Sequence, residues 1–218
     1  HFLKILSYLL ENKEVAGKNA IEYFKDKIED EDLLAQMERA AQVDTEVILF
    51  NIDAKSPMSG KFQKDTLLKI FLKVFYDHQG FYGDSPGIAN MEKYLSSQGK
   101  YKKFKEEYKK SSGFDWVEDR RTFYFKRDHV VKALSAATGM SEEAAKEWHQ
   151  HGSKEFNMDI EGLAREIREY LDSKGPDTRL IFLVDEVGQY IGEDSTLMLN
   201  LQTIAEELGS QCQGRAWI

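Results

Sequence analysis

Two adjacent carboxylates, Asp185 and Glu186, are the residues of this sequence best placed to do chemistry. They directly follow a run of five apolar residues, 180–184, which is typical of a buried strand in a parallel sheet. Open α/β sheets bind ligands at the carboxyl ends of their strands, where this pair would lie. Successive side chains of a strand point in opposite directions, so the two carboxylates can take different roles within one cleft.

The chemistry expected of such a pair is metal-assisted hydrolysis of a nucleotide. Mg²⁺ prefers carboxylate and water oxygens and keeps several waters, so Asp185 alone is sufficient to steady it. Glu186 is the candidate general base, which must lie about 3 Å from the water that it polarises. Gln189 and Tyr190 follow the pair and could meet a γ-phosphate, although the start of a helix explains them equally well. The pattern is degenerate, and the alternative is a strand end whose acids are solvated or cap the next helix.

The elements that would position this pair follow an α/β order. Short apolar runs rich in β-branched residues predict a first strand at residues 46–53, closed by a turn around Ser56, Pro57 and Gly60. Residues 179–184 are predicted to form the second strand, and residues 215–218 begin a third. Helical periodicity fills the long stretch between the first two strands and the shorter one before the third. Parallel strands joined by crossovers are therefore expected.

Helices are predicted on both sides of the first strand. Residues 1–10, HFLKILSYLL, are expected to form a helix with one wide buried face. Residues 20–42 indicate a pair of charged surface helices, and residues 63–78 indicate a further helix.

Capping residues predict the boundaries of two later helices. Asp159 is expected to cap a helix that stops at Gly175-Pro176. After the second strand, Asp194 or Ser195 is expected to cap a helix that ends at Gly209.

Composition excludes several classes of protein. Hydrophobic residues make up 41% and charged residues 31%, a balance typical of a packed globular fold. The formal net charge of -8 argues against a surface that is basic throughout. The single cysteine, Cys212, rules out an intrachain disulfide and a four-cysteine zinc site, and it is interpreted as a small buried residue. No apolar run or secretory pattern predicts a membrane span or export, so a cytoplasmic location is expected.

Five strings of the chain resemble the large P-loop ATPase subunit of bacterial BREX phage-defence systems, the BrxC/PglY family. The longest string, around the acid pair, is the most specific. The strings are RLIFLVDEVGQYIG (179–192), LNLQTIAEELG (199–209), FNIDAKS (50–56), GKYKKFKEEY (99–108) and DWVEDRRTFYF (115–125).

The resemblance implies a truncated P-loop NTPase core of the AAA+/ASCE-like type, with a short parallel sheet of about three strands and a large helical insertion. Residues 1–60 would form the first part of the core, residues 61–175 the mainly helical insertion, and residues 176–218 the Walker B strand, a helix and the start of the sensor strand. In related ATPases the Walker B strand neighbours the sensor strand, so the three strands are expected to be contiguous.

The same resemblance implies roles for the site residues. Asp185 and Glu186 would be the Walker B pair, with Asp185 holding the Mg²⁺ of bound ATP, Glu186 catalytic and Gln189 near the nucleotide. Residues 1–10 would follow a Walker A loop that this chain does not contain. Because that loop supplies the groups that hold the phosphates, the chain itself is expected to bind neither ATP nor Mg²⁺ and to be inactive.

The intact protein is then expected to hydrolyse ATP with other BREX subunits and DNA as partners, without a membrane, and a homo-oligomer is compatible with it. The alternative is a protein-binding or DNA-binding module of a defence complex that does not hydrolyse ATP at all.

A lysine-rich segment is a candidate for nucleic-acid contact. Residues 100–110 hold six lysines interleaved with Tyr101, Phe104 and Tyr108, which suits nucleic-acid contact. The aromatic spacing of three and four favours instead a buried helical stripe surrounded by solvated lysines.

The basic and histidine residues further along have more than one interpretation. Arg120, Arg121, Lys126 and Arg127 flank an aromatic, strand-like run at residues 122–125 and would make an arginine finger, touch DNA or, as we favour, form surface ion pairs. His149 and His151 could begin a metal site, but alternate residues of a helix face different ways and no cysteine lies nearby.

Overall fold

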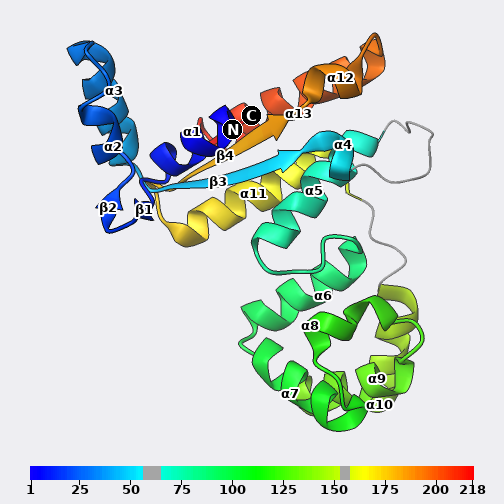
Figure 1. Ribbon diagram of the computed structural model, residues 1–218. Coiled ribbons are helices and arrows are strands. Elements are labelled where there is room, and N and C mark those ends of the chain that lie inside the picture. Colours follow the sequence, from blue (N-terminus) through cyan, green and yellow to red (C-terminus); the bar gives the residue numbers. More distant parts are fainter. Residues whose placement is uncertain (56–64, 153–157) are drawn as a thin grey trace. The chain divides into compact units, whose positions relative to one another are not determined.

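The computed structural model describes residues 1–55, 65–152 and 158–218, and the chain divides into two compact units (Figure 1). Unit 1 comprises His1–Phe71 and Met158–Ile218, and unit 2 comprises Leu72–Asn157. The fold is mixed α/β and mostly helical. No helix in the described ranges is both long and apolar enough to cross a membrane.

Unit 1 contains a three-stranded parallel sheet. The strands are β3 (Thr45–Asn51), β4 (Arg179–Asp185) and β5 (Ala216–Trp217), in the order β3-β4-β5. The expected contiguous parallel sheet is therefore confirmed. The first strand is shorter than expected because Ile52 already begins α4 (Ile52–Lys55), and the predicted turn at Ser56, Pro57 and Gly60 lies outside the described residues.

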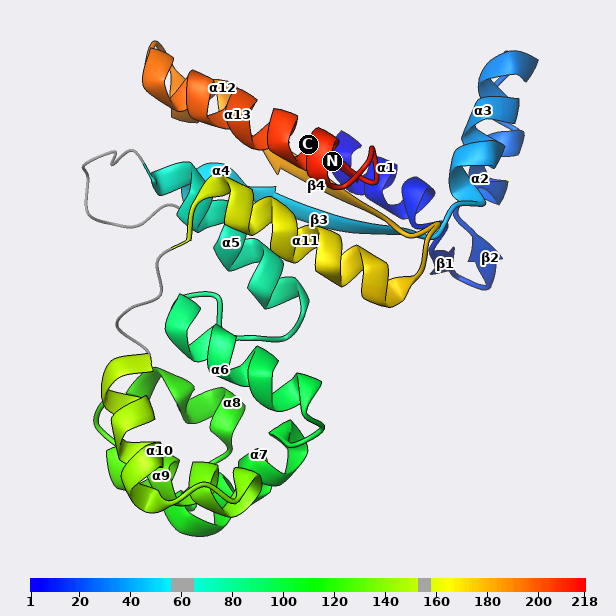
Figure 2. The ribbon, with the colours of Figure 1, turned by 180° about the vertical axis from the view of Figure 1, so that it is seen from behind.

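One face of the sheet is well covered. Figures 1 and 2 show α11 (Ile160–Lys174) and the start of α5 (Thr66–His78) on this face. Phe71 of α5 meets Phe50 of β3 and Phe182 of β4 edge-on, with ring centroids 5.7 and 5.2 Å apart. These edge-to-face contacts fix the helix over the centre of the sheet. The helix predicted from residue 63 is described only from Thr66 onward.

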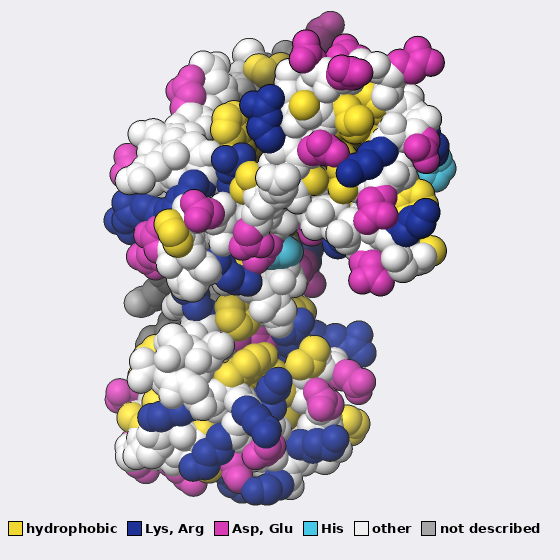
Figure 3. Space-filling model, turned by 90° about the vertical axis from the view of Figure 1, so that its left-hand side faces the viewer, with side chains coloured by type: hydrophobic (Ala, Val, Ile, Leu, Met, Phe, Trp, Pro, Cys, Tyr) yellow, Lys and Arg dark blue, Asp and Glu magenta, His cyan; other side chains and the backbone are white. Residues whose placement is uncertain are grey.

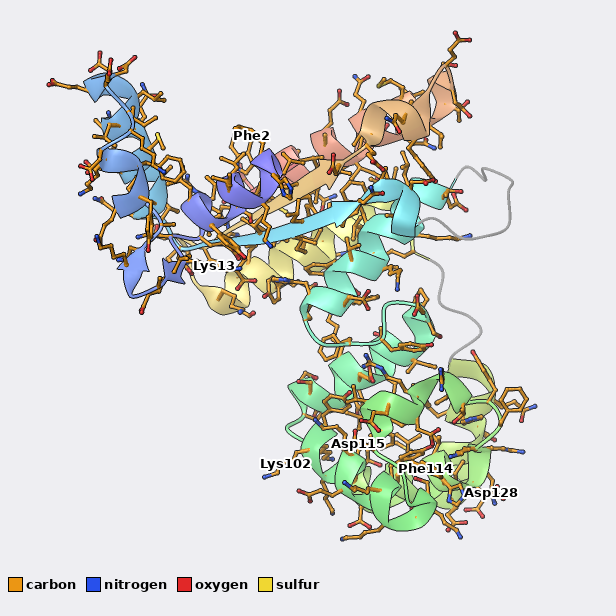
Figure 4. All side chains as sticks on the ribbon, in the orientation of Figure 1. Phe2, Lys13, Lys102, Phe114, Asp115 and Asp128 are labelled. Atoms are coloured by element: carbon orange, nitrogen blue, oxygen red, sulfur yellow. The ribbon has the colours of Figure 1, made fainter. Side chains whose placement is uncertain are left out.

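The opposite face is only partly covered by α1 (Phe2–Leu10). Leu9 is buried, but Phe2 is 75% exposed and Ile5 is 52% exposed, so the prediction of one wide buried face is wrong for these two residues. Figure 4 shows Phe2 projecting from α1 away from the strands. The nine-residue helix is too short to cover the whole face, and Leu49 of β3 is therefore 40% exposed.

Two helix boundaries confirm the capping prediction. Asp159 caps α11 by accepting from the backbone N–H of Gly162 at 2.7 Å. Asp194 caps α13 (Ser195–Gln211) by accepting from the backbone N–H of Leu197 at 3.1 Å. The predicted end at Gly209 is wrong, because α13 continues until Cys212 is buried against α11, where its thiol donates to the carbonyl of Ala164 at 3.6 Å.

The remainder of unit 1 precedes the sheet. The predicted surface helix pair is confirmed as α2 (Glu22–Lys25) and α3 (Glu31–Ala41). A hairpin of β1 (Glu14–Val15) and β2 (Lys18–Asn19) was not predicted. Its turn holds Ala16 at φ 50°, a conformation that alanine rarely adopts. The sequence did not predict the hairpin because alanine stands where the usual Asn-Gly turn pattern has asparagine.

Unit 2 is built from helices packed around an aromatic core. They are α6 (Pro86–Ser97), α7 (Tyr101–Ser112), α8 (Trp116–Asp119), α9 (Arg127–Thr138) and α10 (Glu142–Glu147). Phe104 and Tyr108 of α7 are fully buried, which confirms the predicted helical stripe.

The strand-like reading of residues 122–125 is wrong. Residues Arg120–Thr122 form a 3-10 turn, and Phe123 is buried while Tyr124 and Phe125 are both exposed. A strand would alternate its faces, whereas here only Phe123 enters the core, where its ring stacks on His149 at 4.2 Å.

A fully buried carboxylate, Glu92, lies inside unit 2. It accepts hydrogen bonds from the backbone N–H of Tyr82 (2.6 Å), the hydroxyl of Tyr101 (2.9 Å), the indole of Trp116 (2.7 Å) and the guanidinium of Arg120 (3.2 Å). Burying a charge costs free energy unless it is paired and hydrogen-bonded, and here four donors meet that condition. Glu92 therefore joins four segments of the unit.

Candidate functional site

The acid pair lies where β4 ends and α12 (Val187–Ile191) begins. Glu186 is the N-cap of α12 and has left-handed backbone angles, φ 62° and ψ 21°. Its backbone N–H donates to Oδ1 of Asp185 at 3.0 Å. A left-handed conformation costs a residue with a side chain roughly 1–2 kcal/mol, and Asn12, Ala16 and Gln213 share it, so it does not by itself mark a functional position.

A third residue, Asn51, joins the pair from the neighbouring strand. The parallel register places Asn51 of β3 opposite Asp185 of β4. The side-chain amide of Asn51 donates to Oε2 of Glu186. This bond fixes the orientation of the glutamate at the carboxyl end of the sheet. Sequence reasoning missed Asn51, although its place at the end of a parallel neighbour strand was a usable sign.

The two carboxylates are exposed, and neither forms an ion pair with any cation in the described ranges. Exposed carboxylate oxygens without a counter-cation are the donors that Mg²⁺ accepts, because the ion keeps several waters and needs only one or two protein carboxylates. Among described residues, no group of three or more His, Cys, Asp or Glu could hold a metal. The donors therefore fit Mg²⁺ bound together with phosphate and water, and not a metal held by protein alone.

The residues after the pair divide between surface and core. Gln189 is exposed on α12, and no hydrogen bond within the described part of the chain joins it to Asp185 or Glu186. Tyr190 is buried at 8% exposure, so it packs α12 against unit 1. Of the predicted site residues, Asp185 and Glu186 are joined by a hydrogen bond, and Gln189 follows on α12 without a hydrogen bond to either of them among the described residues.

The basic candidates of unit 2 have structural partners in two cases. Arg120 binds the buried Glu92, and Lys126 pairs with Asp119 at 2.6 Å. Arg121 and Arg127 are exposed and form no ion pair among the described residues.

The histidine and cysteine candidates lie in apolar surroundings. Nε2 of His149 lies 3.0 Å from the carbonyl of Phe123, and burial lowers the pKa of this imidazole. The side chain of His151 lies outside the described residues. Burial raises the pKa of the Cys212 thiol to about 11, which keeps it protonated and unreactive near neutral pH.

A pocket of about 340 Å³ also opens in unit 1, between the starts of α5 and α11 and the middle of α13. Its lining includes Asp65, Glu161 and Glu207 but neither residue of the acid pair. It is therefore separate from the candidate site.

Comparison with known proteins gives no family assignment. No protein-family model matches the chain, and no solved structure matches it significantly.

Proposed function

We propose that this chain carries the Walker B half of an ATP-hydrolysing P-loop ATPase of the AAA+/ASCE-like type that acts in bacterial phage defence. The observation that supports this most strongly is the acid pair at the carboxyl end of the middle parallel strand, with Glu186 hydrogen-bonded to Asn51. Ligand sites of open α/β sheets occur at this end of the strands. The resemblance to the BREX ATPase subunit supplies the reaction and the setting.

In this proposal each residue has one task. Asp185 would hold Mg²⁺ together with water and phosphate oxygens. Glu186 would accept a proton from the attacking water, and the amide of Asn51 would keep its carboxylate aimed at that water. Gln189, which is exposed on α12 three residues after Glu186, would lie near the nucleotide.

The chain lacks the residues that would hold the phosphates. Its Gly-Lys pairs, at residues 17–18, 60–61 and 99–100, are followed by Asn, Phe and Tyr, whereas a phosphate-binding loop requires Ser or Thr there. We therefore propose that the loop comes from elsewhere in the intact protein. We also propose that the partners of the intact protein are other BREX subunits and DNA, in the cytoplasm.

The first test is equilibrium titration of the purified chain with Mg-ATP, for which we expect no binding up to millimolar concentration. Binding with micromolar affinity would overturn the account of the missing loop.

The second test uses the intact protein. Glu186→Gln is expected to retain ATP while turnover falls by on the order of a hundredfold or more, since a general base contributes about 10²–10⁴ in rate. Glu193→Gln, an exposed acid just beyond α12, is the matched control and should leave turnover unchanged. Unchanged turnover in Glu186→Gln would instead favour the second candidate, a binding module without hydrolysis, which the lysine-rich surface of α7 supports.

A further inference from the structure

Helix α7 turns a row of lysines toward solvent. Phe104 and Tyr108 occupy its buried face. The opposite side presents exposed lysines near both ends of the helix, with the exposed Glu106 between them, and Figure 3 shows Lys and Arg side chains gathered over the lower part of the view, which is unit 2. These exposed lysines are Lys102, Lys103, Lys109 and Lys110.

Helix stability accounts for only part of these lysines, because Lys109 and Lys110 lie in the last turn, where the helix dipole favours basic residues. Lys102 and Lys103 lie in the first turn, where the helix dipole favours acidic residues, and this turn contains none. Among described residues, Lys110 pairs with Glu107 at 2.6 Å, but Lys102, Lys103 and Lys109 form no ion pair. Residues 93–132 hold 12 Lys and Arg against 6 Asp and Glu, although the whole chain is acidic.

Exposed aromatic rings lie beyond the end of α7. Phe114 is 57% exposed and Phe125 is 91% exposed. The ammonium group of Lys126 lies 3.8 Å from the centroid of the Phe114 ring, which brings the two segments together. The end of α7 is also joined to the start of α9 by Ser111 and His129, at 2.8 Å. Figure 4 labels Phe114 and Lys102 in this unit.

We propose that unit 2 binds a single-stranded polynucleotide, with the lysines of α7 contacting phosphates and the rings of Phe114 and Phe125 stacking on bases. Unpaired lysines suit any polyanion, but exposed aromatic rings in the same unit suit bases, whose flat faces are open only in a single strand. A duplex or an acidic protein would contact the lysines without stacking on the aromatic rings. The surface belongs to unit 2, whereas Glu186 belongs to unit 1, and it needs no nucleotide, so failure of this proposal would leave the ATPase proposal standing.

The test is fluorescence anisotropy of the full chain with labelled 15-nucleotide dT and rU oligonucleotides and a 15-base-pair duplex, between 50 and 200 mM salt. We expect the single strands to bind, with dT and rU distinguishing DNA from RNA. The triple variant Lys102→Glu/Lys103→Glu/Lys109→Glu should weaken single-strand binding at least tenfold. It should also reduce the salt slope by about 2, since each lost phosphate contact contributes about 0.7.

The control triple variant is Lys18→Glu/Lys27→Glu/Lys69→Glu, which makes the same charge change on exposed residues of unit 1. It should bind like the unchanged chain. Phe125→Ala should weaken binding of the single strands by about 5- to 150-fold and leave any duplex binding unaltered, since stacking is worth about 1–3 kcal/mol per base. If the triple glutamate variant does not fold, Lys102→Gln/Lys103→Gln/Lys109→Gln tests the same contacts.

Three results would overturn the proposal. They are no oligonucleotide binding at 50 mM salt, equal losses in the two triple variants, and competition by polyglutamate as strong as by dT together with no effect of Phe125→Ala. The last result would identify an acidic protein as the partner.

Discussion

Three carboxylates of this chain differ in burial. Glu92 and Asp119 lie in unit 2, and Glu186 lies at the carboxyl end of the middle strand of the sheet in unit 1. Glu92 is fully buried with four donors, and Asp119 is 12% exposed and accepts from Tyr108 (2.7 Å), Lys126 (2.6 Å) and Thr122 (3.0 Å). Glu186 is exposed and accepts one side-chain hydrogen bond, from Asn51.

The hydrogen bonds and exposure of a carboxylate thus indicate whether it stabilises the fold or can bind a ligand. A carboxylate whose oxygens are saturated by fixed donors stabilises a fold and has no capacity left for a ligand. One that is exposed, held by a single amide and placed on strained backbone can still bind or exchange a proton. Mutations of the three carboxylates should therefore lose stability in the order Glu92, Asp119, Glu186.

The largest effect is expected for Glu92→Ala. Removing the carboxylate leaves the indole N–H of Trp116 without its acceptor and Arg120 without its ion pair, although Arg120 keeps the carbonyl of Gly80, so the free energy of unfolding should fall by about 3–5 kcal/mol. Urea denaturation followed by circular dichroism measures this loss. A loss under 1 kcal/mol would show that the network is not needed for the fold.

A smaller effect is expected for Asp119→Asn, about 1–2 kcal/mol at neutral pH, since hydrogen bonds to charged groups are worth about 1.5–3 kcal/mol. Partial burial acts to raise the pKa of Asp119, but hydrogen bonds from Lys126, Tyr108 and Thr122 leave it below the ordinary 3.8.

The contribution of Asp119 is therefore complete above the ordinary pKa and is lost as pH falls through the lowered one. Denaturation of the two proteins at pH 7 and at stepwise lower pH should show their stabilities converging. A difference that is independent of pH would contradict the ion pair with Lys126.

Unit 2 should also lose stability in mildly acidic solution because of His149. Burial holds the pKa of this imidazole below the ordinary 6.5, so below pH 6.5 the unfolded chain binds the proton more readily than the folded one. Stability should then fall from pH 6.5 downward until the folded pKa is reached. Thermal melts at stepwise lower pH should show that this dependence of stability on pH is weaker in His149→Gln. It should be unchanged in His1→Gln, which alters an exposed histidine of unit 1.

The smallest effect on stability is expected at the carboxyl end of β4. Glu186→Gln, at an exposed residue, should change the free energy of unfolding by about 0.5 kcal/mol or less, and Asn51→Ala, at a half-buried one, by about 1 kcal/mol or less. The same urea titrations measure both. A loss near that of Glu92→Ala would make the acid pair a structural feature and end the contrast between the two regions.

Local patterns were sufficient to predict much of the fold. The parallel three-stranded sheet followed from short apolar runs separated by helices, and the caps Asp159 and Asp194 followed from side chains that satisfy free backbone N–H groups. The acid pair was found because it ends a strand.

What could not be predicted depends on contacts between distant residues or on rare backbone angles. The bond from Asn51 to Glu186 joins residues 135 positions apart, and it needs the strand register. The buried role of Glu92 needs donors from four segments, whereas a lone glutamate in a helix suggests a surface residue. The hairpin at Ala16 has no turn pattern because an alanine takes a conformation that favours glycine.

The left-handed backbone at Glu186 means that the fold and the proposed chemistry favour different residues at this position. Glycine would adopt these angles without cost, so a screen that selected only for thermal resistance would tend to discard the glutamate. Under the proposed function, the glutamate is a loss of stability of the kind that proteins accept where activity needs a particular side chain. Selection for stability alone, applied to this chain, would therefore be expected to remove Glu186 among its first changes.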